Sequence, residues 1–224
     1  KNKQGVAQVL NRLNYPSTLS HLRRVNTPID KSGKLIAPRK LHNTQCGFIC
    51  VFESPEGQPV GVVKNLTYLA HVTIRSDVEI IYDVLKGKYW EIEEMNPAEM
   101  YDKVKVFVNG NWIGIVNDPL KLYNYLKDCK SNGRLNCYTG IVFDYHNQEI
   151  RICNDAGRIM RPLLKTKNGN LLLTKQICDD IKSGKLEWND LLINHGESDE
   201  TCIEYIDPEE QEFSMIAMSP KKLQ

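Results

Sequence analysis

The chain has 224 residues, of which 41% are hydrophobic and 25% are charged, and its formal net charge is +1. These values are ordinary for a globular protein and exclude a chain that is disordered over its whole length. No apolar stretch is long enough to cross a bilayer, and the N-terminus lacks the apolar core of a signal peptide, so we expect no membrane partner. The first residue is Lys rather than Met, which suggests a piece of a longer protein.

Charge is distributed unevenly along the chain. Residues 1–40 contain nine Lys and Arg residues and one acidic residue, whereas residues 197–212 contain eight acidic residues and no Lys or Arg. A basic segment attracts polyanions because neutralised phosphates release their counterions, although a solvated basic face has the same composition. The acidic segment is interpreted as a solvated loop or as a surface that meets a basic partner. Any nucleic acid should therefore follow the N-terminal part.

Short helices and a loop are predicted at the N-terminus. Apolar residues at helical spacing predict an amphipathic helix over residues 5–14. Pro16 should end this helix, and Ser17 with Thr18 should cap a second short one. Residues 30–34, Asp-Lys-Ser-Gly-Lys, predict an exposed loop that carries two lysines.

The middle of the chain alternates between apolar runs and turn signals. Residues 48–51 predict a buried strand, and residues 53–59 predict an irregular polar loop. Further along, the predicted elements are a hairpin over 104–116 around Asn109-Gly110, a helix from Asp118-Pro119 to Asn132-Gly133, a second hairpin over 141–153 around His146-Asn147, a turn at 168–170 and an amphipathic stretch over 176–192.

Several kinds of chemistry have no sequence signature here. The seven cysteines are scattered, and no Cys-x-x-Cys pair occurs, so we expect a reducing compartment. Cys46 and Cys50 have the spacing of a first metal-binding pair, but no second pair follows them. No phosphate-binding glycine loop and no acidic cluster for two magnesium ions are present. Taken alone, these residues predict an α+β protein whose basic N-terminal region binds nucleic acid.

Short strings in a fixed order carry a more specific resemblance. The first set is GVAQVLNR (5–12), STLSHLRR (17–24), NTPI (26–29), PRKLHNT (38–44), ESPEGQ (53–58) and VKNL (63–66). Together they resemble the fork region of the second-largest subunit of DNA-directed RNA polymerase, of the archaeal and eukaryotic type, and a large DNA virus would also fit as the source. FVNGNWIG (107–114) and NDAGRIMRPL (154–163) resemble the first external domain of that subunit. EYIDPEE (204–210) with MIAM (215–218) resembles the second.

The resemblance implies a multi-module α+β fragment of a nucleotidyltransferase. Residues 1–73 would form the fork region, 74–93 a connector, 94–165 the first external module, and 166–224 the second external region that leads to the hybrid-binding region. The fragment would hold no cofactor and no metal and would have no catalytic residue, because the Mg²⁺ of the whole enzyme is held mainly by the largest subunit. Its expected partners are that subunit, other polymerase subunits, template DNA and the RNA–DNA hybrid. Its expected location is the nucleus for a cellular eukaryote, and the cytoplasm or virion for a large DNA virus.

The resemblance also implies roles for individual residues. Two groups follow: nucleic-acid contacts by Gln8, Arg23, Arg24, Lys31, Lys34 and Arg39, and support of the active centre by His42, Glu53, Glu56 and Gln58. Arginine guanidinium groups bind phosphate in a bidentate manner, and the two lysines would act near the point of strand separation. The alternatives are that Arg24 and Arg39 pair internally with Glu53 or Glu56, that Gln8 is a plain surface residue, and that His42 is structural.

The chain departs from the family pattern at Cys46 and Val51, where many relatives have Trp and Pro. Both positions lie beside the 53–58 loop and concern its local geometry. Two rival functions remain open. One is a free-standing nucleic-acid-binding module, which predicts tight, salt-dependent binding by the isolated chain. The other is a docking scaffold for polymerase subunits or factors, formed by residues 94–224.

Overall fold

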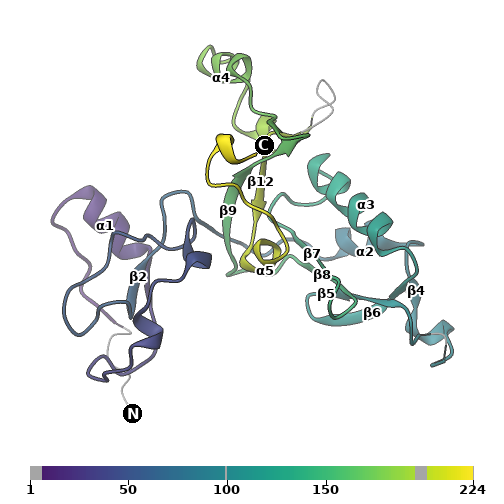
Figure 1. Ribbon diagram of the computed structural model, residues 1–224, viewed down its shortest axis with the longest axis horizontal. Helices are drawn as coiled ribbons and strands as arrows, with labels where there is room; N and C mark the ends of the chain where they lie inside the picture. The colour runs from purple at the N-terminus through teal and green to yellow at the C-terminus, as the bar shows by residue number, and fades with distance from the viewer. Residues whose placement is uncertain (1–6, 99, 195–200, 224) are drawn as a thin grey trace. The chain divides into compact units, whose positions relative to one another are not determined.

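The computed structural model describes residues 7–98, 100–194 and 201–223 (Figure 1). By the spatial contacts between its residues, the chain divides into two compact units, residues 1–70 (unit 1) and residues 71–224 (unit 2). Helices and strands are mixed along the chain, so the predicted α+β class is confirmed. The predicted module boundaries at residues 73, 93 and 165 stay predictions. Within the described ranges, no helix is both long and apolar enough to span a membrane.

The first predicted helix does not form in the part of the segment that the structure describes. Residues 7–14 are not helical, and residues 5 and 6 of the predicted helix lie outside the described ranges. Val9 and Leu13 are 95% and 84% exposed. A short helix is stable only when tertiary packing covers its apolar face, and this segment has no such cover. The periodicity was therefore a misleading signal here.

The first helix in the described part of unit 1 is α1 (Tyr15–Leu22). Its N-cap is Asn14, whose side-chain oxygen accepts a hydrogen bond from the Ser17 amide at 2.8 Å. The predicted cap at Ser17 is therefore wrong. Pro16 begins the helix instead of separating two helices, because a proline in the first turn removes only an amide that has no helical partner.

The rest of unit 1 is mostly loop. Two short strands, β1 (Arg24–Asn26) and β2 (Val63–Asn65), pair antiparallel, and two single-turn 3₁₀ helices, η1 (Ala37–Arg39) and η2 (Asn43–Gln45), lie between them. The strand predicted over residues 48–51 is reduced to one isolated bridge between Ile49 and Leu66, although Phe48 is buried as expected. The predicted polar loop over 53–59 is confirmed, since none of these residues is in a helix or a strand.

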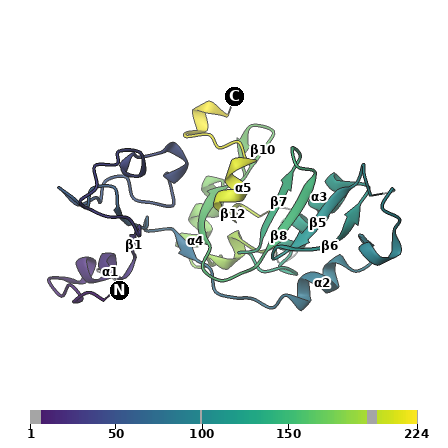
Figure 2. The same ribbon diagram turned by 90° about the horizontal axis from the view of Figure 1, so that it is seen from below.

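Unit 2 contains a five-stranded sheet in the order β4-β6-β5-β8-β7 (Figure 2). The two predicted hairpins are confirmed as β5 (Val104–Val108) with β6 (Asn111–Val116) and β7 (Gly140–Asp144) with β8 (Glu149–Cys153). Positive φ values at Asn109 and Gly110 give the tight turn that the Asn-Gly pair predicted. The hairpins join through the parallel pair β5–β8, and β4 (Trp90–Glu91) adds one edge.

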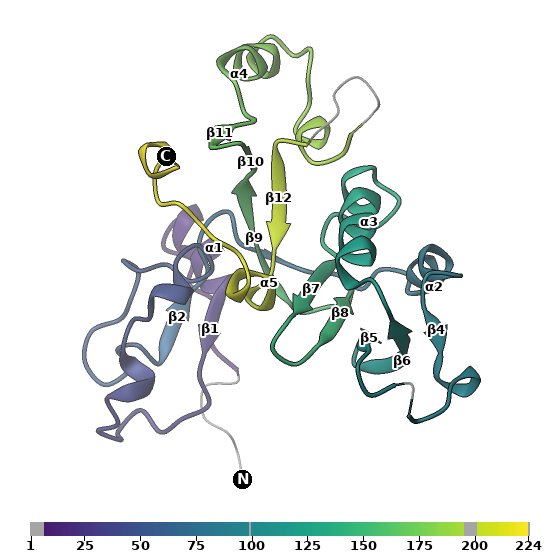
Figure 3. The same ribbon diagram turned by 45° about the vertical axis from the view of Figure 1, so that its right-hand side comes forward.

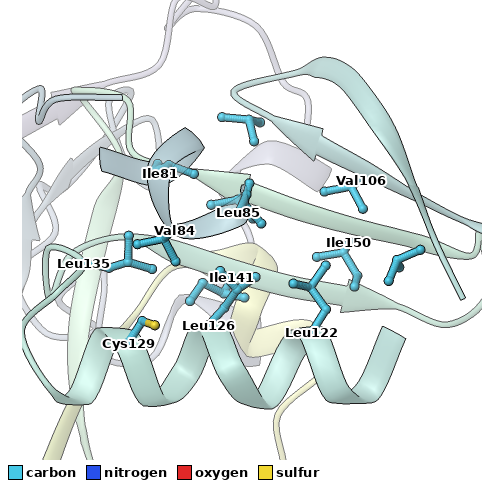
Figure 4. Packing of buried hydrophobic residues seen from close by; sticks show 13 residues of the cluster. Ile81, Val84, Leu85, Val106, Leu122, Leu126, Cys129, Leu135, Ile141 and Ile150 are labelled. Atoms are coloured by element: carbon cyan, nitrogen blue, oxygen red, sulfur yellow. The ribbon is translucent and has the colours of Figure 1, made fainter. Parts of the chain in front are cut away.

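Two helices supply the other half of the main core. The predicted helix is confirmed as α3 (Pro119–Ser131), and α2 (Glu79–Leu85) contributes a second apolar face. Figure 4 shows Leu122 and Leu126 pointing from α3 toward Ile150 and Ile141 of the sheet. The remaining buried members of this cluster are Ile81, Val84, Leu85, Val106, Val108, Val116, Cys129, Leu135 and Ile152.

A second sheet in unit 2 has the order β12-β9-β3 (Figure 3). Its strands are β3 (His71–Val72), β9 (Ile159–Leu164) and β12 (Ile203–Ile206). The predicted turn at 168–170 is confirmed between β10 (Thr166–Lys167) and β11 (Asn170–Leu171). The amphipathic stretch forms α4 (Lys175–Lys182) and then η4 (Asn189–Leu191), and both pack against a second core around Met160 and Ile203.

Most of the described acidic segment faces inward. Glu210, in α5 (Pro208–Glu212), is buried, and together with Glu204 it pairs with Lys127 and Lys130 of α3. The shortest of these contacts are 2.6 Å from Lys127 to Glu204 and 2.8 Å to Glu210. The interpretation as a solvated loop or partner surface is therefore wrong for Glu204, Asp207 and Glu210; Glu197, Asp199 and Glu200 lie outside the described residues.

A further ion pair and a capping box fix the end of this segment. Arg158 contacts Asp207 at 3.0 Å and donates to the Tyr138 carbonyl at 2.8 Å. Asp207 caps α5 by accepting from the Glu210 amide, while the Glu210 carboxylate accepts from the Asp207 amide. These contacts join β12 and α5 to the rest of unit 2. They can be buried because each charge has an opposite charge or a hydrogen-bond partner beside it.

Leu126→Ala should destabilise unit 2 by about 2–5 kcal/mol, because the removed side chain is fully buried and leaves a cavity. Leu120→Ala on the same helix is the matched control, since Leu120 is 62% exposed and its loss should cost less than about 0.5 kcal/mol. Urea unfolding followed by tryptophan fluorescence measures both, since all three tryptophans lie in residues 71–224. Equal unfolding midpoints for the two variants would contradict the described core.

Glu204→Gln should remove a pH dependence from unit 2. Burial opposes ionisation, but Lys130 and Lys127 overcome it and lower the pKa of Glu204 to about 2. The carboxylate therefore contributes on the order of 3 kcal/mol above its unfolded pKa, and this contribution is lost as pH falls from about 4.5 toward 2.

The measurement is the urea midpoint, followed by tryptophan fluorescence between pH 7 and pH 2. The difference in urea midpoint between wild type and Glu204→Gln should shrink as the pH falls through the acidic interval. The midpoint of the exposed control Glu212→Gln should follow that of wild type at every pH. A constant difference between wild type and Glu204→Gln would show that the carboxylate is not held in its charged form.

Candidate nucleic-acid interface

Unit 1 holds a strong excess of positive charge. Residues 1–70 contain ten Lys and Arg residues and three acidic ones, a formal charge of +7, while residues 71–224 balance this with −6. A cationic unit of this kind attracts polyanions at long range. The candidate site is therefore sought among the basic side chains and loops of unit 1.

The loop that carries Lys31 and Lys34 is shaped by Asp30. Its carboxylate accepts from the Ser32 amide at 2.9 Å and from the Ser32 hydroxyl at 2.8 Å, and these two bonds hold the pKa of Asp30 below its ordinary value. Lys31 is half-buried and Lys34 is exposed. Within the described residues, neither ammonium group has a hydrogen bond or an ion pair. The loop therefore presents two cations that are available to an anion.

Arg39, by contrast, is fully engaged within unit 1. Its guanidinium donates to five backbone carbonyls, at 2.5–3.2 Å. An arginine side chain has five N–H donors, so each is matched by one acceptor. The predicted phosphate contact of Arg39 stays a prediction, and in this conformation it would require these bonds to open. The acceptors are the carbonyls of Lys31, Gly33, Leu35, Gln58 and Val60.

Arg23 and Arg24 differ in how many of their side-chain donors are used within unit 1. Arg23 is half-buried and donates to the carbonyls of Thr67 and Ala70 at 2.8 and 2.7 Å. Arg24 is exposed and uses only Nε, which donates to the Asn65 side chain at 3.2 Å. Its terminal nitrogens have no hydrogen bond or ion pair in the described part of the chain. The alternative pairing of Arg24 or Arg39 with Glu53 or Glu56 is also not found among these residues.

The 53–58 loop is held at both ends and exposed between them. At its start, Glu53 accepts a hydrogen bond from the Ser20 hydroxyl through its carboxylate and one from the Asn65 side chain through its carbonyl at 3.1 Å. At its end, the Gln58 carbonyl accepts from Arg39. Glu56 lies in the exposed stretch between these anchors, next to Gly57 with φ +78°. The loop can thus present Glu56 outward without losing its fixed ends.

The two remaining predicted residues make local contacts. Gln8 is exposed, and its side-chain oxygen lies 2.9 Å from Nε2 of His21, whose Nδ1 accepts from the Asn11 amide at 3.0 Å. His42 caps η2 through Nδ1, which accepts from the Thr44 amide. The structural interpretation of His42 therefore has a direct geometric basis.

Two residues of this site were missed by the sequence reasoning. Asn65 is buried and connects Arg24, Ser20 and the Glu53 carbonyl through its amide group. Gly61 has φ +68°, and a Cβ there would lie 2.6 Å from the Cα of Arg39. A glycine after a turn and an asparagine in a strand are weak signals, although both stand within or beside strings that carried the resemblance.

Unit 1 also leaves many apolar side chains uncovered. Over residues 7–70, the buried apolar residues are Phe48, Val62 and Ala70. Exposed apolar groups of this number on a small unit are typical of surfaces that pack against other protein. The large apolar residues exposed here include Val9, Leu13, Tyr15, Leu22, Leu35, Ile36, Leu41, Phe52, Tyr68 and Leu69.

Metal binding has no site among the described residues. They contain no group of three or more His, Cys, Asp or Glu side chains that could hold a metal ion.

Family models match three stretches of the chain. Residues 8–72 match domain 3 of RNA polymerase Rpb2, residues 106–167 match domain 4, and residues 188–224 match domain 5. The first of these stretches contains the described site residues. The three matches follow the same order along the chain as the numbering of the domains.

Similar proteins come from eukaryotes, a virus and an archaeon. The chain is 44% identical over its whole length to DNA-directed RNA polymerase II subunit RPB2 of Encephalitozoon cuniculi, covering 19% of that protein. It is 38% identical over its whole length to DNA-directed RNA polymerase subunit 2 of Acanthamoeba polyphaga mimivirus, covering 18%. It is 34% identical over 99% of its length to DNA-directed RNA polymerase subunit Rpo2 of Sulfolobus acidocaldarius, covering 20%.

The chain spans about a fifth of the length of these curated relatives. The resemblance drawn from the short strings is confirmed by the three domain matches and by identities that extend over the whole chain. The chain therefore belongs to the family of second-largest subunits of DNA-directed RNA polymerase, of which it contains sequence from domains 3, 4 and 5.

Proposed function

We propose that this chain is part of a DNA-directed RNA polymerase, a nucleotidyltransferase, and that unit 1 lines the channel that holds template DNA and the RNA–DNA hybrid. The observation that carries the proposal is the Asp30–Lys34 loop, which presents two available ammonium groups on a unit of formal charge +7. Family membership supplies the reaction class, and the charge supplies the reason why this unit faces nucleic acid.

The proposed role of each basic side chain follows from whether its donors are already used within unit 1. Lys31, Lys34 and Arg24 have available donors and would contact phosphates, which positions a nucleic acid without reading its sequence. Arg23 and Arg39 hold the backbone of the loops, and direct phosphate contacts by them would need a rearrangement. Gln8 would contact the hybrid through its amide, since it is exposed at the start of the described chain.

The 53–58 loop would support the active centre. Glu56 is exposed between two fixed ends, while Glu53 and Gln58 belong to those ends and His42 caps the neighbouring turn. None of these residues belongs to a group able to hold a metal ion within the described ranges, so the residues present do not fit the two Mg²⁺ ions of nucleotidyl transfer. We propose that these ions are held mainly by the largest subunit.

The exposed apolar side chains of unit 1 fit a role inside a larger assembly. The largest subunit and other polymerase subunits are the proposed partners, and the cover they provide would complete a unit that buries few apolar groups itself. The proposed location follows the relatives: the nucleus for a eukaryotic enzyme, or the cytoplasm or virion for a viral one.

The isolated chain should bind a short RNA–DNA hybrid only weakly, and the affinity should fall further as salt is added, because an incomplete channel wall makes few phosphate contacts. Fluorescence anisotropy across a salt series measures this. Tight binding would favour a free-standing module, and absence of binding at low salt would favour a docking scaffold.

Lys31→Ala with Lys34→Ala, introduced into the whole enzyme, should reduce the salt dependence of DNA retention by elongation complexes. Each lost phosphate contact lowers the slope of log K against log salt by about one, so a change of up to about two is expected. The matched control is Lys221→Ala with Lys222→Ala, which removes two exposed lysines from unit 2. A slope that is unchanged in the first variant would exclude the proposed phosphate contacts.

A further inference from the structure

Arg39 joins two segments that are separate in the sequence. On one side its Nη2 donates to the carbonyls of Lys31 and Gly33, both at 2.8 Å. On the other side its Nη1 donates to the carbonyls of Gln58, at 2.5 Å, and Val60, at 3.0 Å. The first segment carries the two available lysines, and the second forms the fixed end of the loop that presents Glu56.

The Arg39 side chain is itself anchored. Arg39 is the last residue of η1, and its amide donates to the Ile36 carbonyl at 3.0 Å. Its Nε donates to the Leu35 carbonyl at 3.2 Å. The guanidinium plane is therefore fixed at its base as well as at both ends. A planar fork held in this way transmits a displacement of one loop to the other, because its donors cannot rotate independently.

A second, independent contact holds the 57–63 segment against η1, the helix that carries Arg39. Gly61 packs directly on the Arg39 backbone, and a Cβ at this position would lie 2.6 Å from Arg39 Cα and 2.8 Å from its carbonyl carbon. The turn that contains Gly61 is thus held against η1 by backbone packing in addition to the guanidinium. The approach depends on the absence of a side chain and on a left-handed φ of +68°.

We propose that Arg39 is a positioning residue that makes the 30–35 loop and the 57–63 segment move as one body. This inference rests on the proposed function for its biological meaning: a contact between nucleic acid and Lys31 or Lys34 would be felt at the loop that presents Glu56. The coupling runs through backbone carbonyls and needs no direct contact between Arg39 and a phosphate.

Arg39→Lys separates this role from a phosphate contact. Lysine keeps the positive charge, so it should largely preserve an electrostatic contact with a phosphate. It has only three N–H donors on a single nitrogen and cannot replace five bonds that point in fixed directions. If Arg39 acts by positioning, the lysine variant should be as impaired as Arg39→Ala.

The test is amide hydrogen exchange in the assembled polymerase, followed at two sets of amides. Ser32 and Gly33 report on the first segment, since both donate to Asp30. Val60, Val62 and Val63 report on the second, since they donate to Gly57 and Pro59. Arg39→Lys should accelerate exchange in both segments by about tenfold, because several hydrogen bonds are lost together.

Two further variants complete the design. Gly61→Ala keeps the guanidinium group but forces the Arg39 backbone to shift, so it should accelerate exchange in the same two segments. Arg23→Lys is the matched control, because Arg23 donates to Thr67 and Ala70, so its effect should appear near those residues and not in the two loops. Faster exchange confined to one segment, or unchanged exchange in both, would overturn the coupling.

The rate of nucleotide addition at saturating nucleotide distinguishes this inference from the proposed function. With both segments loosened, kcat should fall about tenfold while the KM for nucleotide changes little, because a misplaced loop impairs alignment more than binding. Coupled exchange with an unchanged kcat would support the coupling and overturn the proposed role of these loops in the active centre.

Discussion

Hydrogen bonds from arginine side chains to backbone carbonyls fix the loops of unit 1. Carbonyl groups that turn away from water need a donor, and loops supply few donors of their own. Arg39 donates to five backbone carbonyls and Arg23 to two, and four of these seven bonds are partly buried. Because residues 7–70, the described part of this unit, bury only Phe48, Val62 and Ala70 among their apolar residues, packing alone offers little to define its conformation. Basic side chains therefore have a structural task here as well as an electrostatic one.

Unit 2 is stabilised in a different way. Two apolar clusters fill the spaces beside its sheets, and a buried group of charges joins α3 to β12 and α5. Such a unit has the means to keep its shape on its own. Unit 1, with exposed apolar groups and loops tied by hydrogen bonds, has the character of a part completed by neighbouring protein. This difference agrees with a chain that covers about a fifth of its relatives.

Local signals in the sequence predicted local structure well. The turn at Asn109-Gly110 requires only positive φ at two adjacent residues. The start of α3 requires only a position in the first turn where the missing amide of Pro119 costs no helical hydrogen bond. Over residues 7–14 the predicted helix is absent, because periodicity cannot show whether a surface exists to cover it. The strand over 48–51 failed because one bridge to Leu66 replaces a full ladder.

Pairings across long sequence separations could not be predicted from residue types. Lys127 meets Glu204 and Glu210 from 77 and 83 positions away, and nothing in an acidic run shows that its partners lie in an earlier helix. For the site, the basic residues were recognised from charge and from the family strings. Which of them would donate to backbone carbonyls, and which would stay available, depended on where the carbonyls of the folded loops lie. The importance of Asn65 and Gly61 likewise depended on contacts that only the fold creates.

The inward-facing acidic residues change what the surface of unit 2 offers to its surroundings. Counted along the sequence, residues 201–212 form a strongly negative strip, but Glu204, Asp207 and Glu210 each sit beside a cation. Paired charges create a dipolar field that decays with distance far faster than that of a net charge, and physiological salt shortens its range again. Glu209 also lies 3.7 Å from Arg151. A passing polyanion would therefore sense mainly Glu212 there, so this stretch is a much weaker electrostatic barrier than its composition implies.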